Sequence, residues 1–302
     1  ALRVSSMPSL RRAFAVAAVL FAAKTPMPRS YAQKMPKASH AFTAKMCAGS
    51  RFLESQRRDA LFVDPLASKL AGPEGLQQPM GDWIMVPRTR FGDDFIIEHY
   101  TQRGVRQLVL LGAGMDARAY RLRLPELKVF EVDLPILFQD KEPLLEGETL
   151  RVQSRTAVPT DFSSGEDWSW RLRQCPDFDP RQPTVWLLEG LMMYLTAREA
   201  SETFRRLGAL SAVGSALFFD AISASYVRQG IVVGGAPFLG GSDRYGDWLR
   251  DLASFGSTQV WDFASLQVDR WNRRLNKDWA RTLSPAELYG RNVVLFVESH
   301  KV

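Results

Sequence analysis

Short apolar segments alternate with helical segments along this 302-residue chain, and this alternation limits the possible folds more than any other feature. The expected strands cover residues 108–111, 129–132, 150–153, 185–188 and 216–219. Helices are expected between them, at residues 116–122, 136–145, 168–173 and 197–210. A strand, a crossover helix and a second strand form a right-handed unit, and repeated units give a parallel sheet that is covered on both faces. The sequence therefore predicts a doubly wound, mostly parallel α/β domain.

Further segments flank the alternating part. Helical spacing of apolar residues at 42–70, with a break at Asp64-Pro65, predicts two N-terminal helices. A loop is expected at 72–81 and a helix at 89–103. Residues 221–276 form an expected lid insertion, although its glycine-rich part, 231–245, is as typical of a simple flexible connection as of a lid over a site. A last strand is predicted at 293–297.

The N-terminal region has a distinct composition. Residues 1–53 hold nine Lys or Arg and no Asp or Glu, so beyond them the 33 acidic residues outnumber the 30 basic ones. Without a basic stripe in the body, nucleic-acid binding is not expected. An apolar run at 13–23 follows Arg11 and Arg12 and is too short to span a bilayer.

We interpret residues 1–38 as a targeting leader or a disordered extension, and residues 39–302 as the catalytic-size domain. The absence of acidic residues in the leader predicts a plastid or mitochondrial transit peptide. The cytoplasm and export are the alternatives.

Cysteine and histidine usage predicts neither a disulfide framework nor a metal site. Cys47 and Cys175 are the only cysteines, and His40, His99 and His300 lie far apart in the sequence without the spacing of metal ligands.

Two glycines and a carboxylate mark a candidate nucleoside site. Gly112 and Gly114 follow the first expected strand in LLGAGMDA, which also satisfies the dinucleotide pattern GxGxxG/A. The second strand ends in FEVD, where either Asp133 or Glu131 could bind the ribose hydroxyls of a dinucleotide or of S-adenosylmethionine.

The later strands favour a cationic cofactor. Asp161 follows the third strand and Glu189 follows the fourth, so carboxylates are expected at three neighbouring strand ends. Ligands bind at that edge of a parallel sheet. S-adenosylmethionine carries a sulfonium and an ammonium group, which carboxylates attract, whereas they would repel a pyrophosphate.

Four motifs in order resemble the leucine carboxyl methyltransferase superfamily, and most of all its bacterial-type S-adenosylmethionine-dependent members. The motifs are RTRFGDDF (88–95), LLGAGMDARAYRL (110–122), FEVDLP with the following Lys141 (130–141) and WLLEGLMMYLT (186–196). Residues 50–72 also resemble the region that precedes the cofactor domain in that group. The resemblance runs from about residue 40 to residue 220 and implies a Rossmann-like class I methyltransferase fold.

The resemblance also implies contacts to the methionine part of S-adenosylmethionine. Arg90 would meet its carboxylate, with Arg51 as a weaker candidate for a second contact, and Glu189 would lie near its amino group. The alternative for Arg90 is a surface ion pair with Asp93 or Asp94.

The nucleoside part has its own implied contacts. Gly112 and Gly114 would line the cofactor, Asp133 would hold the ribose, and Asp161 and Phe162 would flank the adenine.

The expected reaction is methyl transfer to a carboxylate or hydroxyl of a small molecule. A protein C-terminal carboxyl methyltransferase is the alternative, and a dinucleotide-dependent oxidoreductase or a non-catalytic binding protein follows from weaker signals. A carboxylate acceptor needs no general base, whereas a hydroxyl needs one. Tyr194 and His99 are candidates, but we expect Tyr194 in the core and His99 on a helix surface, so neither is assigned.

Overall fold

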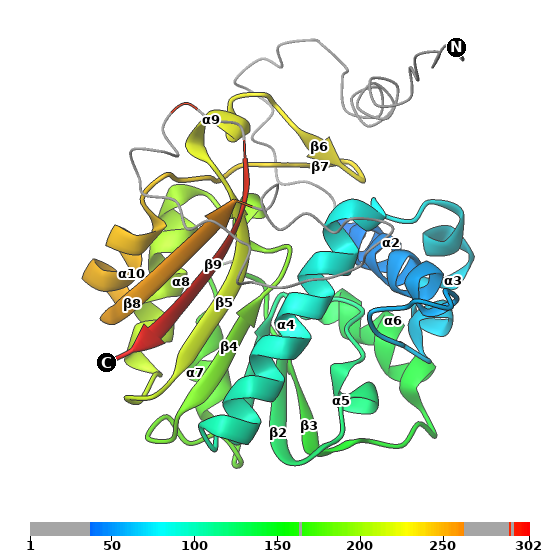
Figure 1. Ribbon diagram of the computed structural model, residues 1–302, viewed down its shortest axis with the longest axis horizontal. Coiled ribbons are helices and arrows are strands. Elements are labelled where there is room, and N and C mark those ends of the chain that lie inside the picture. Colours follow the sequence, from blue (N-terminus) through cyan, green and yellow to red (C-terminus); the bar gives the residue numbers. More distant parts are fainter. Residues whose placement is uncertain (1–36, 163–164, 263–289, 291–292) are drawn as a thin grey trace, which may run out of the picture.

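A seven-stranded sheet forms the centre of the protein in the computed structural model, which describes residues 37–162, 165–262, 290 and 293–302. The strand order is β3-β2-β1-β4-β5-β9-β8 (Figure 1). The first five strands are parallel, and β9 runs antiparallel to both β5 and β8. Their bounds are β1 Gln107–Leu111, β2 Leu124–Asp133, β3 Val152–Pro159, β4 Thr184–Leu188, β5 Ala216–Ile222, β8 Phe255–Asp262 and β9 Val294–Lys301. The predicted mostly parallel α/β architecture is confirmed.

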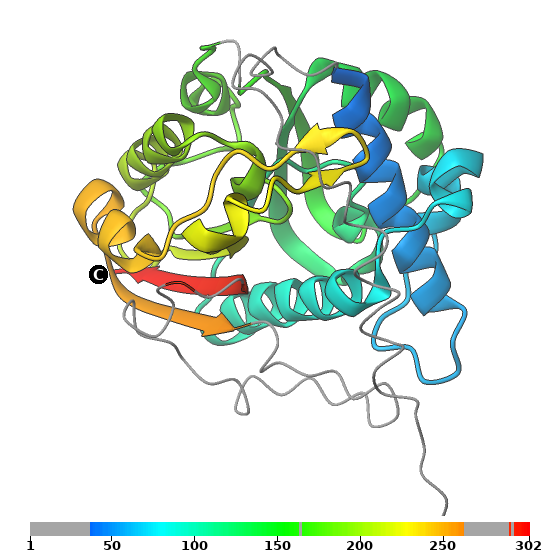
Figure 2. The ribbon, with the colours of Figure 1, turned by 90° about the horizontal axis from the view of Figure 1, so that it is seen from above.

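The middle of the sheet is buried on both faces. Every residue of β1, β4 and β5 is buried, as expected for central strands that helices cover on both sides. Helix α4 (Asp82–Gln102) lies against one face, and α7 (Trp168–Arg173), α8 (Ala197–Ala209) and α10 (Tyr245–Ala253) cover the other (Figure 2). The short helix α5 (Arg118–Arg121) and helix α6 (Pro135–Leu145) follow β1 and β2 in the chain.

The N-terminal helices α2 (Lys37–Ser55) and α3 (Ala67–Gln77) cross very closely. A Cβ atom on Gly49 would lie 2.1 Å from the carbonyl oxygen of Gly75, and one on Gly75 would lie 2.2 Å from the carbonyl oxygen of Lys45. Only glycine permits this approach. Together with α6, the pair forms a separate apolar cluster beside the sheet.

Some expected boundaries were wrong. The predicted loop at 72–81 is largely helical, because α3 continues through a kink at Gly72 (φ 58°) and α4 begins at Asp82, with Pro87 inside it. The third strand lies at 152–159 rather than 150–153. It is an edge strand with polar residues along its middle, so a search for apolar residues placed it too early.

The region after β5 is not a single lid. Helix α9 (Ala224–Val227) leads to a small hairpin of β6 (Val232–Val233) and β7 (Ala236–Pro237), which lies above the sheet beside α2 (Figure 2). Helix α10 and strand β8 instead belong to the main domain, because β8 pairs with β9. Residues 263–276 of the predicted insertion, and 1–36 of the predicted leader, lie outside the described residues. Among the described helices, none is long and apolar enough to cross a membrane.

Candidate functional site at the strand ends

Most of the predicted site residues follow neighbouring strands at one edge of the sheet. Gly112 and Gly114 come after β1, Asp133 ends β2, Asp161 follows β3, and Glu189 follows β4. These strands are adjacent and parallel, so their carboxyl ends meet at that edge.

The loop after β1 is held between β2 and helix α2. Gly112 (φ 73°) donates its backbone N–H to Val132 O at 2.8 Å, and Gly114 (φ 50°) donates to Asp133 Oδ2 at 2.6 Å. Both backbone conformations favour glycine. A Cβ on Gly114 would also lie 3.1 Å from the side chain of Ala44, so α2 packs directly on this loop.

Asp133 is fixed by two backbone groups. Its Oδ1 accepts from Leu134 N at 2.6 Å, and its Oδ2 accepts from Gly114 N. Burial raises the pKa of this carboxyl, while the two N–H donors oppose that rise. Each carboxylate oxygen has a second lone pair, so Asp133 can still accept from a hydroxyl.

Glu131, the alternative to Asp133, is fully buried and bonded to cations. Lys141 Nζ donates to Glu131 Oε2 at 2.7 Å, and Arg155 donates to both Glu131 oxygens at 2.8 and 2.7 Å. Glu131 and Lys141 both have side chains with 0% exposure. Glu131 is therefore a buried carboxylate that pairs with Lys141 and Arg155. Asp133 is the carboxylate at the end of β2 that is available to a ligand.

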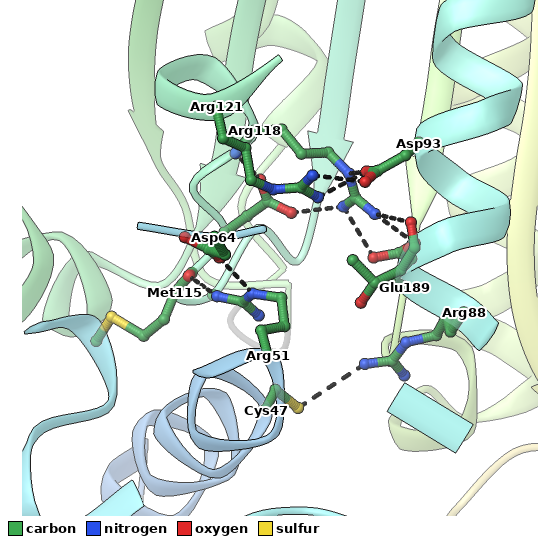
Figure 3. Close-up of polar contacts among 12 residues, drawn as sticks. Cys47, Arg51, Asp64, Arg88, Asp93, Met115, Arg118, Arg121 and Glu189 are labelled. Atoms are coloured by element: carbon green, nitrogen blue, oxygen red, sulfur yellow. Dashed lines mark hydrogen bonds and ion pairs between the residues drawn. The ribbon is translucent and has the colours of Figure 1, made fainter. Parts of the chain in front are cut away.

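Glu189 belongs to a buried ionic cluster (Figure 3). Both of its oxygens accept from Arg118 at 2.9 Å, and Arg118 also contacts Asp93 at 2.7 Å and Asp116. Arg121 pairs with Asp93 as well. Three carboxylates thus share two guanidinium groups, so this cluster at the strand ends has a formal charge of −1 when all five groups are ionised.

A second buried arginine, which the sequence analysis did not single out, approaches from α4. Arg88 Nη1 donates to Asp220 Oδ2 at 2.8 Å. Its Nη2 lies 3.8 Å from Cys47 Sγ (Figure 3). Asp220 also accepts from Gly190 N at 2.6 Å, directly after Glu189. Among the described residues, the buried Arg88 Nε has no hydrogen-bond partner.

Arg90 does not join these groups. It pairs with Asp94 at 2.9 Å, donates to Leu61 O at 2.8 Å, and has a side chain that is 39% exposed. Residues two apart on a helix are roughly 200° apart around its axis, so Arg88 and Arg90 cannot both face the strand ends. The structure thus shows the surface ion pair that was the alternative for Arg90.

Arg51 lies beside the glycine loop and makes two side-chain hydrogen bonds there. It pairs with Asp64 at 2.8 Å and donates to Met115 O (Figure 3). It therefore ties α2 to the loop.

Aromatic side chains lie next to the ionic groups. The ring of Tyr194, in the 3-10 helix η2 (Met192–Tyr194), lies 5.4 Å from that of His40 and 5.3 Å from that of Phe238. Burial raises the pKa of Tyr194 and lowers that of His40, for which the charge of Asp161 acts in the opposite direction. Tyr194 is only partly buried, so it is not the core residue that we expected. His40 had been noted only as an isolated histidine.

Phe162, which the resemblance predicted to flank the adenine, follows β3 in the chain. It is partly buried and packs on the core near Trp168, with ring centroids 6.4 Å apart.

The β6–β7 hairpin closes over this region. A Cβ on Gly234, at its turn, would lie 2.6 Å from the Thr43 side chain of α2. The hairpin and α2 are therefore in contact above the strand ends.

His99 is not on the surface. Only 2% exposed, it contacts Phe95 O through Nδ1 at 2.8 Å and His300 Nε2 through Nε2 at 3.2 Å. The expectation was wrong because this part of α4 lies against the sheet, and His99 is not among the strand-end groups. Within the described ranges, no group of three or more His, Cys, Asp or Glu is placed to hold a metal ion.

Comparison with known proteins identifies the same family that the sequence motifs resemble. The sequence model of the family described as leucine carboxyl methyltransferase matches residues 44–208. A Streptomyces coelicolor protein named "Putative S-adenosyl-L-methionine-dependent methyltransferase" is 37% identical over 71% of this chain and 81% of its own length. A Frankia alni protein with the same description is 41% identical over 57% of this chain and 65% of its own length.

Solved structures share the fold. A crystal structure titled as a "putative methyltransferase" from Thermobifida fusca aligns with a TM-score of 0.55 and 15% identity, over 91% of this chain and 98% of that one. A DUF574 family protein from Streptomyces avermitilis aligns with a TM-score of 0.54 and 13% identity, over 84% and 97%.

The relatives also correct the predicted location. They come from bacteria, among them Streptomyces, Frankia and Mycobacterium. The prediction of a plastid or mitochondrial location is therefore wrong.

Proposed function

Because this chain belongs to the leucine carboxyl methyltransferase family, we propose that it methylates an oxygen atom of a small molecule, either a carboxylate or a hydroxyl. The chain is an S-adenosylmethionine-dependent methyltransferase. The observation that carries the choice of a small acceptor is the cover formed by α2 and the β6–β7 hairpin. A site covered from two sides suits a small molecule better than a folded protein surface.

The charges at the strand ends fit S-adenosylmethionine. The ionic cluster around Glu189 has a formal charge of −1, which suits the ammonium group, and Asp133 has free lone pairs for the ribose hydroxyls. Asp161 and Phe162 would flank the adenine, and Gly112 would line the cofactor with Gly114. A pyrophosphate would meet the same carboxylates with unfavourable repulsion, so these charges disfavour the dinucleotide alternative.

Arg88 is our candidate for the carboxylate of the methionine part, in place of Arg90. Its unpartnered Nε is a buried donor, and burying an unmade hydrogen bond is costly. A carboxylate near Nε would satisfy that donor.

Bound S-adenosylmethionine supplies an electrophilic methyl group on its sulfonium. The protein's part is to align the acceptor oxygen and to exclude water, and α2 and the hairpin are placed to do both. For a carboxylate acceptor, no proton has to move.

For a hydroxyl acceptor, His40 is the best-placed base. Its lowered pKa keeps the imidazole neutral near neutral pH, so it can accept the proton. The raised pKa of Tyr194 keeps that hydroxyl protonated, so Tyr194 can donate a hydrogen bond to the acceptor.

The test is transfer of a tritiated methyl group from S-adenosylmethionine to a bacterial extract, separated into small molecules and acid-precipitable protein. Label in small molecules supports the proposal, and alkaline treatment then separates the two acceptor types. Methyl esters release methanol in alkali, whereas methyl ethers keep the label. Label mainly in precipitated protein would overturn the proposal in favour of protein carboxyl methylation. An Asp133→Asn variant is the control for turnover at this site.

A further inference from the structure

Gly92 has no side chain, and this leaves room beside helix α4 for the Glu189–Arg118 pair. A Cβ on Gly92 would lie 2.4 Å from Glu189 Oε1 and 2.8 Å from Arg118 Nη2. Gly92 is in an ordinary helical segment, where glycine is otherwise unfavourable. Here the glycine allows α4 to pack directly against the bidentate ion pair between Arg118 and Glu189.

Arg118 is held on several sides. It is 2% exposed, its Nε donates to Asp93, and its Nη2 donates to Thr89 O at 3.2 Å in addition to Glu189. These contacts come from α4 and from the end of β4, while Arg118 itself begins α5. The guanidinium plane is therefore fixed before any ligand arrives, and with it the plane of the Glu189 carboxylate (Figure 3).

We propose that Arg118 is a positioning residue that keeps the buried Glu189 carboxylate ionised and oriented toward the ammonium group of the cofactor, in a space that Gly92 leaves open. This inference rests on the proposed contact between Glu189 and that ammonium group. The contact alone does not imply any role for Arg118. The inference adds that the ionised state of Glu189 depends on this neighbour, which does not touch the cofactor.

Electrostatics explains the dependence. Burial raises the pKa of Glu189, and Arg118 acts most strongly in the opposite direction, followed by Arg88 from α4. Asp116, in the loop after β1, raises it further. Without Arg118, burial and Asp116 would be opposed by Arg88 alone among these groups, so protonation of Glu189 would move toward neutral pH.

A protonated Glu189 has no charge to offer an ammonium group. Loss of Arg118 should therefore weaken binding of S-adenosylmethionine at low pH and weaken it less at high pH, where Glu189 ionises again. A purely structural role would weaken binding by the same factor at every pH.

The experiment is calorimetric titration with S-adenosylmethionine from about pH 6 to about pH 7.5, a range over which an ordinary glutamate stays ionised and the α-ammonium group of the ligand keeps most of its charge. Arg118→Gln is the main variant, because Asp93 keeps its pair with Arg121. Arg118→Lys retains the positive charge without the bidentate contact. Gly92→Ala displaces the Glu189 carboxylate and leaves the charges of Arg118 and Glu189 in place. Methylthioadenosine, which lacks the amino acid part, is the matched ligand.

We expect the affinity of the unaltered protein to change less than about threefold across the range. Arg118→Gln should bind S-adenosylmethionine about tenfold or more weakly near pH 6, recover several-fold toward about pH 7.5, and bind methylthioadenosine nearly as before. Arg118→Lys should keep a flat pH profile. Gly92→Ala should weaken S-adenosylmethionine more than methylthioadenosine.

Two outcomes separate this inference from the proposed function. If Glu189→Gln abolishes binding while Arg118→Gln gives a uniform loss or none, the role of Arg118 is wrong and that of Glu189 stands. If Glu189→Gln binds normally, the contact to the ammonium group is wrong and the inference fails with it. Should Arg118→Gln not fold, equal losses of the two ligands in Gly92→Ala would overturn the inference.

Discussion

The backbone N–H of Gly114 donates to Asp133 Oδ2 at 2.6 Å, so one carboxylate joins the loop after β1 to the end of β2. Asp133→Asn would turn an amide nitrogen toward one of two backbone donors, because Leu134 N occupies the other oxygen. We expect S-adenosylmethionine affinity to fall about 10–100-fold, as for the loss of charge-assisted hydrogen bonds. Isothermal calorimetry measures this fall.

Asp94→Asn is the matched control, since Asp94 is a half-exposed carboxylate on α4 that pairs with Arg90. Its affinity should stay within about twofold, because an exposed ion pair contributes little. Equal losses in both variants would remove the special role of Asp133.

The two arginines on α4 provide a second contrast. Arg88→Lys keeps a cation beside the fully buried Asp220 but removes the Nε donor, so S-adenosylmethionine should bind about tenfold more weakly. Arg90→Gln should bind within about twofold of the unaltered protein. The reverse order in a binding titration would restore the contact that the sequence predicted for Arg90.

The crossing of α2 and α3 predicts a stability effect. Gly49→Ala would place a methyl group 2.1 Å from Gly75 O, and separating the helices should lower the free energy of unfolding by about 1–3 kcal/mol. Gly246→Ala is the control, because its Cβ would make only ordinary contact with Thr258 at 3.8 Å. It should be neutral or stabilising by about 0.5–1 kcal/mol. Urea unfolding followed by circular dichroism compares the two.

His99 predicts a pH dependence of stability. Burial lowers its pKa from the ordinary 6.5, with the charges of His300 and Arg103 acting in the same direction, while the Phe95 carbonyl and Glu98 oppose the shift. Below the ordinary pKa the unfolded state therefore binds more protons than the folded state, and stability falls as the pH drops through that value.

The variant His99→Gln should show a shallower fall in the urea midpoint between about pH 7.5 and about pH 5.5. When the free energy of unfolding is plotted against pH, the slopes for the two proteins cannot differ by more than about 1.4 kcal/mol per pH unit, because only one proton is involved. His40, whose pKa burial also lowers, contributes to both proteins and cancels in the comparison. Parallel pH curves would show that the burial of His99 has no such effect on stability.

The strands that the sequence located well are those buried along their whole length. Residues 185–188 of β4 and 216–219 of β5 are continuous apolar runs, so these residues alone reveal the two strands. β3 was misplaced because Ser154, Arg155 and Thr156 occupy its centre, and Arg155 is there to pair with Glu131, a partner 24 residues away. Such a long-range pair leaves no periodic signal.

The site shows the same division. Gly112, Gly114 and Asp133 follow directly from strand ends and loop geometry, so the sequence could predict where they lie. The choice between Arg88 and Arg90 depended on the rotation of α4, which its weakly periodic sequence does not reveal. His40 and Tyr194 meet across more than 150 residues, and only the packing of α2 brings them together.

Strand β9 lies between β5 and β8 and pairs with both. During synthesis, residues 294–301 leave the ribosome after every other strand of this sheet. Until then β5 lacks its neighbour on one side and β8 has no partner in the sheet, so apolar strand edges stay exposed. The methyltransferase domain can therefore complete its sheet only after residues 294–301 have emerged, so a nascent chain that stalls before β9 keeps edges of β5 and β8 without their partner.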